Sequence, residues 1–286
     1  MLSIDPKEIS TNKLHGYLLG AVAPRPIAFA STMDADGNPN LSPFSFFNVF
    51  GANPPILIFS PARRVRDNTT KHTLENALAT KEVVINMVNY DIVQQMSLSS
   101  SEYPAGVNEF DKAGFTMLAS ENIKPFRVAE SPVQFECKVT DVIGTGSEGG
   151  AGNLIVCEVV KMHISEAVLD VHGAIDQYKI DLVARAGGSY YSRARAGFFE
   201  ILKPISSLGI GVDAIPVAIR NSPILTGNDL GMLGNVAQLP SKSTVDNFAK
   251  EHPKFIGLET LKKHTFAKEF LNKKEVESAW KVLLIK

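Results

Sequence analysis

The chain has 286 residues, with 29 Lys and Arg against 30 Asp and Glu, and its formal net charge at pH 7 is −1. Nucleic-acid-binding proteins normally carry a basic surplus, so this balance argues against nucleic acid as a partner. Hydrophobic residues make up 44% and charged residues 21% of the chain, which is typical of a globular protein that buries a full core.

The two cysteines argue against a disulfide framework or a zinc site. Cys137 and Cys157 are far apart and form no CxxC pair, and both lie in alternating apolar and polar runs that are typical of core thiols on strands. The N-terminus lacks the pattern of a signal peptide, and no apolar run approaches the roughly 20 residues that span a bilayer. We therefore expect a cytoplasmic protein with no metal site and no membrane contact.

Residues 3–20 begin like a helix start or a capped turn and then place apolar side chains at i, i+3 and i+4 spacing, which predicts a short element ahead of the first strand. Arg25 follows between two prolines, and Pro26 favours an extended backbone at that position. A guanidinium held in this way can clamp a phosphate or the edge of a ring. An arginine that closes a loop through backbone carbonyls is the alternative interpretation.

The stretch 24–60 contains two apolar strands, at 27–30 and 56–59, with a run of turn-forming residues at 36–39 between them. Such a turn joins antiparallel strands, so we predict that the two strands pair with each other. Between them, residues 42–48 alternate hydroxyls with aromatic rings and end in an amide. This run suits a planar ligand with polar edges, although an aromatic core strand with solvated serines has the same composition.

A basic and hydroxyl-rich loop occupies residues 61–73 and leads into an amphipathic helix predicted over 74–78. Thr73 or Asn68 is the expected capping residue. Cationic groups next to the free N–H groups of a helix N-terminus can hold a phosphate. A solvated loop would look the same.

Further strands are predicted over residues 82–88, 133–143 and 153–164, with a helix over 91–98 and a polar loop over 99–110 to which we assign no chemistry. The glycine-rich segment 144–152 lacks the Gly-Lys-Ser/Thr that closes a phosphate-binding loop, so it predicts a flexible hairpin tip. His163, alone on a strand, is expected to be structural.

The C-terminal third differs in character. Residues 199–240 are rich in glycine and proline and predict irregular structure, whereas helices are expected from 243 to about 251 and beyond 258. We predict one domain over residues 1–197 and a C-terminal extension over 198–286, turn-rich and then helical.

Several motifs in the first 60 residues resemble those of the flavin reductase-like family, which includes flavoredoxin. They are Pro24-Arg25-Pro26-Ile27-Ala28, Ser31-Thr32, Asp36-Gly37, the run from Asn40 to Asn48, and Asn53-Pro54-Pro55. The likeness extends over residues 10–195 and includes Lys71-His72-Thr73, where the family usually has Lys-Asp-Thr. It implies a mainly β fold with peripheral helices, an antiparallel, Greek-key-like split β-barrel that binds FMN.

The resemblance also implies roles for individual residues. Arg25, Pro26 and Ile27 would lie beside the flavin ring, and Ser31 and Thr32 would meet its polar edge or the ribityl chain. Ser45, Phe46 and Asn48 would cover and hydrogen-bond the cofactor, and Lys71 and Thr73 would hold the phosphate. Family members are typically homodimers with FMN at the subunit interface. We assign no catalytic residue, because the cofactor carries the chemistry.

The implied function is the reduction of a flavin or another acceptor by NADH or NADPH through bound FMN. The alternative is a flavoredoxin-like carrier that receives electrons from a protein partner. A module that binds another planar ligand, such as haem, is a third possibility. The chain contains no strand-linked GxGxxG, but split-barrel reductases lack this motif too, so it does not separate the three.

Overall fold

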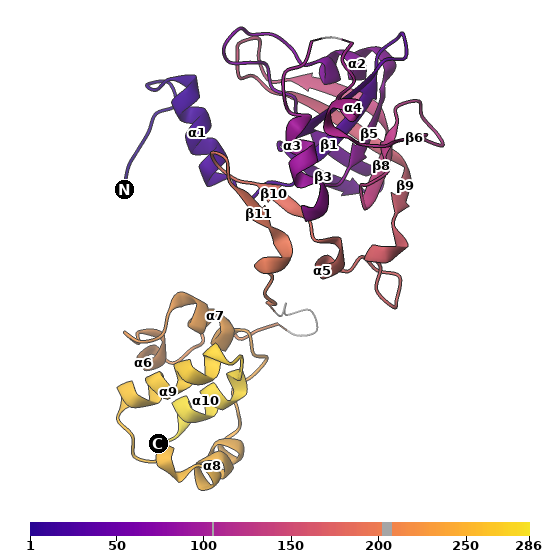
Figure 1. Cartoon of the computed structure of the whole chain (residues 1–286). Helices are drawn as coiled ribbons and strands as arrows, with labels where there is room; N and C mark the ends of the chain where they lie inside the picture. Colours follow the sequence, from indigo (N-terminus) through magenta and orange to yellow (C-terminus); the bar gives the residue numbers. More distant parts are fainter. Residues whose placement is uncertain (105, 202–207) are drawn as a thin grey trace. The chain divides into compact units, whose positions relative to one another are not determined.

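The structure is a computed structural model that describes residues 1–104, 106–201 and 208–286. The chain divides into two compact units, Met1–Phe198 and Phe199–Lys286. Figure 1 shows the first as a strand-rich unit and the second as a helical one.

The first unit is built on one antiparallel seven-stranded sheet with the order β2-β1-β5-β8-β9-β4-β3. Its strands are β1 (Ala28–Met33), β2 (Pro39–Phe44), β3 (Phe47–Ala52), β4 (Pro55–Phe59), β5 (Glu82–Asn86), β8 (Val133–Gly144) and β9 (Asn153–Ile164). The two edge strands, β2 and β3, are joined only by Ser45 and Phe46, so the sheet must curl until its edges meet at that turn. The predicted split barrel is confirmed.

The predicted pairing of the first two apolar strands is wrong. The turn after β1 leads into β2, which pairs with β1, whereas β4 lies between β9 and β3. Residues 39–52, which contain prolines and many polar groups, themselves form β2 and β3. Proline is tolerated in β2 because an edge strand has N–H groups that need no partner in the sheet.

Helices and short strands complete the unit. They are α1 (Thr11–Ala21), α2 (His72–Thr80), η1 (Tyr90–Ile92), α3 (Val93–Leu98), α4 (Glu109–Ala113), η2 (Glu166–Val168), α5 (Gln177–Ile180), η3 (Ala194–Ala196), and the strand pairs β6 (Met117–Leu118) with β7 (Arg127–Val128) and β10 (Val183–Arg185) with β11 (Tyr191–Arg193). The strands and the helix predicted between residues 82 and 164 are confirmed.

Side chains alternate between two cores across the sheet. Ala28 and Ala30 of β1 face the barrel interior, which also contains both cysteines and the apolar face of α2. Phe29 points to the other side, into a cluster with α3 and α4. Because α2 contributes Leu74 to the interior, the first turn of this helix is fixed against the barrel.

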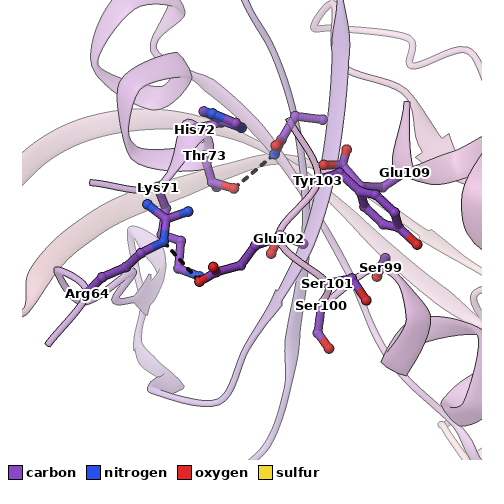
Figure 2. A pocket seen from close by; sticks show the side chains of 12 residues that line it. Arg64, Lys71, His72, Thr73, Ser99, Ser100, Ser101, Glu102, Tyr103 and Glu109 are labelled. Atoms are coloured by element: carbon purple, nitrogen blue, oxygen red, sulfur yellow. Dashed lines mark hydrogen bonds and ion pairs between the residues drawn. The ribbon is translucent and has the colours of Figure 1, made fainter. Parts of the chain in front are cut away.

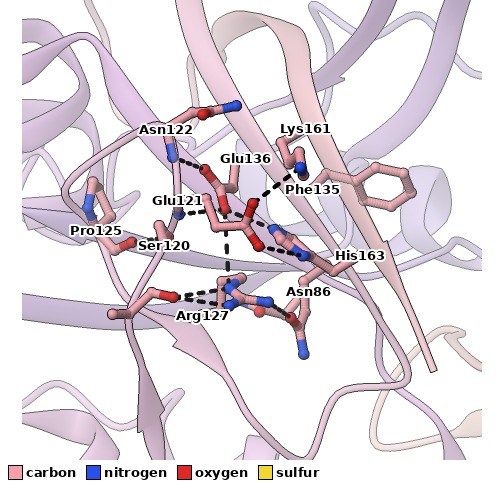
Figure 3. Close-up of polar contacts among 12 residues, drawn as sticks. Asn86, Ser120, Glu121, Asn122, Pro125, Arg127, Phe135, Glu136, Lys161 and His163 are labelled. Atoms are coloured by element: carbon pink, nitrogen blue, oxygen red, sulfur yellow. Dashed lines mark hydrogen bonds and ion pairs between the residues drawn. The ribbon is translucent and has the colours of Figure 1, made fainter.

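A buried carboxylate ties the segment before β7 to the sheet (Figure 3). Glu136 of β8 is fully buried and accepts hydrogen bonds from the N–H groups of Glu121 at 2.9 Å and Asn122 at 2.7 Å. The ring Nε2 of His163 lies 2.7 Å from the same carboxylate. Burial alone would raise the pKa of Glu136, but these hydrogen bonds and His163 hold it below its usual range. His163 therefore has a structural partner, as expected.

The second unit, from Phe199, is helical where it is described. Its elements are α6 (Val217–Arg220), α7 (Gly227–Gly234), α8 (Lys242–Glu251), η4 (Pro253–Phe255), α9 (Thr260–Asn272) and α10 (Val276–Leu284). Trp280 is fully buried in its core, and its Nε1 donates to the carbonyl of Leu233 at 3.0 Å.

Two of these helices, α6 and α7, lie in the stretch predicted to be irregular. The glycines obscured α7, which starts with a capping box between Thr226 and Asp229. At its end, a Cβ on Gly234 would come within 3.0 Å of the backbone of Gly211. Glycine is therefore needed for close packing at this position rather than for a turn.

Across both units, no helix in the described ranges has the length and apolar character needed to cross a membrane.

Candidate functional site

The N-terminus of α2 faces a polar pocket (Figure 2). The pocket is lined by Asn40, Ser42, Arg64, Lys71, His72, Thr73, Ser99, Ser100, Ser101, Glu102, Tyr103 and Glu109. Within the part of the chain that the structure describes, no side chain caps α2, whose first residues are His72 and Thr73. The predicted caps are wrong, because Thr73 lies inside the helix. The first N–H groups of an uncapped helix such as α2 favour an anion.

Hydroxyls and amides beneath the pocket form one buried network. The Asn40 Nδ2 donates to Thr73 Oγ1 at 2.9 Å and to Thr32 Oγ1 at 3.2 Å, and Asn76 Nδ2 donates to Thr32 Oγ1 at 3.1 Å. The structure thus brings Thr32, Lys71 and Thr73 together. Thr32 is fully buried, so it reaches the pocket only through its neighbours. Asn40, a residue of the family-like run, was missed as a site residue because its amide acts across two strands and a helix.

The basic loop ahead of α2 is braced by its own side chains. The Arg64 guanidinium donates to Thr69 Oγ1 at 2.9 Å and to the carbonyl of Thr70. Arg63 donates to the side chain and carbonyl of Asn68, each at 2.6 Å. This loop is therefore a folded structure that holds its cations in place.

The glycine-rich hairpin tip contacts this loop instead of remaining flexible. Arg63 N donates to the carbonyl of Ala151 at 2.8 Å, Gly150 N donates back to Arg63 at 3.0 Å, and Asn68 Nδ2 donates to Ser147 at 3.0 Å. The prediction of a flexible tip is corrected accordingly. It failed because the partner lies about 80 residues away in sequence.

Gly149 marks the closest approach of the tip to the basic loop. A Cβ there would lie 3.0 Å from the carbonyl oxygens of Arg64 and Val65. We expect Gly149→Ala to push the two segments apart, to cost about 1 kcal/mol of stability, and to weaken anion binding at the pocket. Gly146→Ala is the control, because its nearest contact, the Ala151 side chain at 3.5 Å, is ordinary. Equal phosphate affinities of the two variants would contradict this coupling.

One carboxylate, that of Glu102, already forms ion pairs with the cationic side chains at the pocket. The Glu102 carboxylate accepts from Arg64 Nε at 3.1 Å and pairs with Arg66, and Lys71 Nζ lies 3.9 Å from it. The guanidinium groups of Arg66 and Arg64 hold the pKa of Glu102 below its usual range. Burial and Arg64 lower the pKa of Lys71, and Glu102 opposes them. Glu102 belongs to the loop to which we assigned no chemistry.

A second carboxylate, Glu109 of α4, closes the pocket on the sheet side. It is buried and accepts from the N–H of Leu41 at 3.1 Å. Burial raises the pKa of Glu109, although the Leu41 hydrogen bond acts in the opposite direction. The sequence signal for it was the family-like Glu109-Phe110 pair, to which we gave no role.

Apart from Ser31, which precedes Thr32 in β1, the other predicted residues lie at the opposite end of β1 and β2. Arg25 is buried, donates to the carbonyls of Leu19 at 2.7 Å and Val22, and lies 3.4 Å from the Ser45 hydroxyl. Burial lowers the pKa of its guanidinium, and nearby Arg185 lowers it further. Its contacts match the loop-closing interpretation, and the Ser45 contact also places Arg25 beside the β2–β3 turn.

Surface exposure separates the remaining predicted residues. Phe46 and Asn48 are exposed, and Asn48 Oδ1 accepts only a local hydrogen bond from Val49 N at 2.8 Å. Ile27 is buried in the outer core and Pro26 is half-buried. The Ser31 hydroxyl is buried and has no hydrogen-bond partner among the described residues.

This geometry combines a polar, cation-lined pocket at the start of α2 with a hydroxyl- and ring-bearing turn at the other end of β2. The two ends are one six-residue strand apart, about 20 Å. A ligand with an anionic end and a planar end fits such a layout.

Sequence comparison identifies the protein family to which the chain is similar. The flavin reductase like domain matches residues 20–179. A protein of Aquifex aeolicus is 38% identical over 188 residues, covering 66% of this chain and 93% of the relative. A Halalkalibacterium halodurans protein is 34% identical over 194 residues, covering 67% and 92%.

Solved structures share the fold. Nitrilotriacetate monooxygenase component B from Bacillus cereus is 28% identical, with a TM-score of 0.65 over 71% of this chain and 98% of that one. The 2-nitrobenzoate 2-nitroreductase of Pseudomonas fluorescens is 25% identical, with a TM-score of 0.64 over 72% and 98%. Flavoredoxin of Desulfovibrio vulgaris, 20% identical with a TM-score of 0.54 over 65% and 93%, supports the fold alone.

The class defined by the fold and the matches is that of the split-barrel flavoprotein oxidoreductases. The chain belongs to the flavin reductase-like family.

Proposed function

We propose that this protein binds FMN along β2 and uses NADH or NADPH to reduce it, passing the electrons to a free flavin or another acceptor. The observation that carries the proposal is the cation cluster at the uncapped start of α2. FMN differs from riboflavin by its phosphate, and an anion site of this kind is what that phosphate requires.

At the phosphate end, each residue has a defined task. Lys71 Nζ has a partner only at 3.9 Å within the described chain, which is beyond hydrogen-bond distance. It is therefore free to bind a phosphate oxygen. The Thr73 hydroxyl, which accepts from Asn40, can donate its own proton to the phosphate. Thr32 and Asn40 position that hydroxyl.

At the other end of β2, the proposed residues orient the flavin ring and cover it. Arg25 fixes the C-terminal end of α1 through the Leu19 and Val22 carbonyls and positions the Ser45 hydroxyl. Phe46 and Asn48 offer an exposed ring face and an amide. Pro26 and the buried Ile27 would contribute backbone groups. The Ser31 hydroxyl, which is next to Thr32 in β1 and has no partner among the described residues, would hydrogen-bond to the ribityl chain or the ring edge.

Bound FMN would supply the two-electron chemistry. The protein then needs to bind the cofactor, orient it and exclude water from it. The alternative function, an FMN carrier without nicotinamide use, shares this site. An anaerobic titration of the FMN-loaded protein with NADH and NADPH separates the two. Rapid bleaching of the visible flavin band by either donor supports the reductase. A band that bleaches only with dithionite rejects it and leaves the carrier.

The exposed apolar surface supports a homodimer with the flavin at its interface. No residue of α1 is buried, and Figure 1 shows this helix standing apart from the sheet. Tyr17 and Leu18 are 42% and 52% exposed, and Val49 and Phe50 on the edge strand β3 are each 64% exposed. A second copy would cover this surface and complete the site.

We expect Phe50→Glu to convert a dimer into the 31.0 kDa monomer and to weaken FMN binding, because a buried charge at an interface is costly. Sedimentation velocity measures the mass. Val171→Glu, at a 93% exposed position in a turn, is the matched control and should remain dimeric. A wild-type protein that sediments as a monomer would contradict the interface.

A further inference from the structure

Glu102 is placed where the proposed phosphate should be. It contacts the two arginines of the basic loop and lies 3.9 Å from Lys71, and Figure 2 shows its carboxylate directed at Arg64 and Lys71. Carboxylates and phosphates are both anions that arginine binds through paired N–H groups. The pocket therefore holds an anion that belongs to the chain.

Charge counting favours exchange between the two anions. Arg64, Arg66 and Lys71 face Glu102 and Asp67, which leaves one positive charge in the cluster. Without Glu102 two positive charges remain, which match a phosphate monoester of about −1.5 to −2 at neutral pH. With Glu102 in place, a phosphate would meet a cluster that is already half neutralised and a carboxylate that repels it.

The segment that carries Glu102 is not part of the barrel sheet, and the backbone hydrogen bonds around it are local. The N–H groups of Ser100 and Ser101 donate to carbonyls in the last turn of α3, and the N–H of Tyr103 donates to the carbonyl of Ser101. The Glu102 side chain, 38% exposed, lines the pocket and pairs with Arg64 and Arg66 of the basic loop. Its ion pairs are of the exposed kind, which contribute little stability.

We infer that Glu102 is an internal competitor for the phosphate site, which exchanges with the phosphate of an incoming ligand and thereby sets the affinity for phosphorylated against unphosphorylated flavin. The inference rests on the proposed phosphate site. It predicts that the affinity for FMN is held below what the cations could provide, so that FMN can be released.

The test compares the wild-type protein with Glu102→Gln, which keeps the size and removes the charge. We expect the Kd for FMN, from quenching of flavin fluorescence, to fall by about two- to fivefold, while the Kd for riboflavin stays unchanged. Glu166→Gln, an exposed carboxylate on η2, controls for net charge and should leave both values unchanged. An unchanged or raised Kd for FMN in Glu102→Gln would overturn the inference while leaving the proposed function intact.

A second readout uses inorganic phosphate and does not depend on the flavin. Titration followed by the ³¹P line width should show tighter binding to Glu102→Gln than to the wild type. If the wild type binds no FMN, the proposed function fails, and this measurement still decides the role of Glu102. Equal binding of phosphate by both proteins would then reject the competitor.

Discussion

Lys71→Ala is expected to raise the Kd for FMN by roughly ten- to a hundredfold. A charged hydrogen bond contributes about 1.5–3 kcal/mol, and each 1.4 kcal/mol is about tenfold in affinity. The Lys71 side chain is 30% exposed, and its ammonium is 3.9 Å from Glu102, beyond hydrogen-bond distance, so it is available to a ligand. Titration of flavin fluorescence with FMN measures the change.

A titration with riboflavin shows whether Lys71→Ala removes a phosphate contact or disturbs the fold in general. Lys71→Ala should leave the Kd for riboflavin nearly unchanged, because that ligand has no phosphate. Lys161→Ala, which removes an exposed partner of Glu121, should leave both flavins unaffected. If FMN binding to Lys71→Ala is normal, Lys71 does not belong to the site.

Glu136→Ala is expected to lower the free energy of unfolding by about 3–5 kcal/mol. The substitution leaves two backbone N–H groups, those of Glu121 and Asn122, and the His163 ring without their buried acceptor. Urea unfolding measures the loss. Glu121→Ala is the matched control in the same network, and it should cost less than about 1 kcal/mol, because its carboxylate is 54% exposed. Similar losses for the two variants would show that Glu136 is not the centre of the network.

The pH dependence has a defined sign. The pKa of Glu136 is lower in the folded than in the unfolded protein, so the folded state binds fewer protons between these two values. The contribution is complete above about pH 5 and is lost as the pH falls from the unfolded value, near 4.3, through the lower folded one. Glu136→Gln should remove this part of the acid slope. If the acid slope is unchanged in Glu136→Gln, Glu136 does not contribute to the pH dependence of stability.

How far the sequence predicts the fold depends on periodicity. A continuous apolar run marked β5, which is buried on both faces, and alternation marked β8 and β9, which each turn one face into the barrel. Strand β2 was missed, since its two prolines are acceptable only at a sheet edge, and β3 was missed with it, because the sequence 42–48 was treated as one run that crosses from β2 into β3. Their position at the edges follows from closure of the whole sheet, which no local pattern encodes. The helix α7 was missed for a similar reason, as its glycines serve packing between segments.

The site was predictable where a motif carries it. Lys71 and Thr73 stand next to a helix start that the pattern indicated, and the structure places them on one pocket. Glu102 and Asn40 reach the same place through contacts between distant segments. Their charge and amide groups are visible in the sequence, but the partners that give them a role appear only once the chain has folded.

The most direct test of FMN binding is to identify and count the cofactor. The purified protein is reconstituted with FMN, freed of excess ligand and denatured, and the released compound is identified by chromatography. We predict one FMN per chain, with binding lost in the denatured protein. A protein that retains no flavin after reconstitution, or that carries haem instead, would contradict the account.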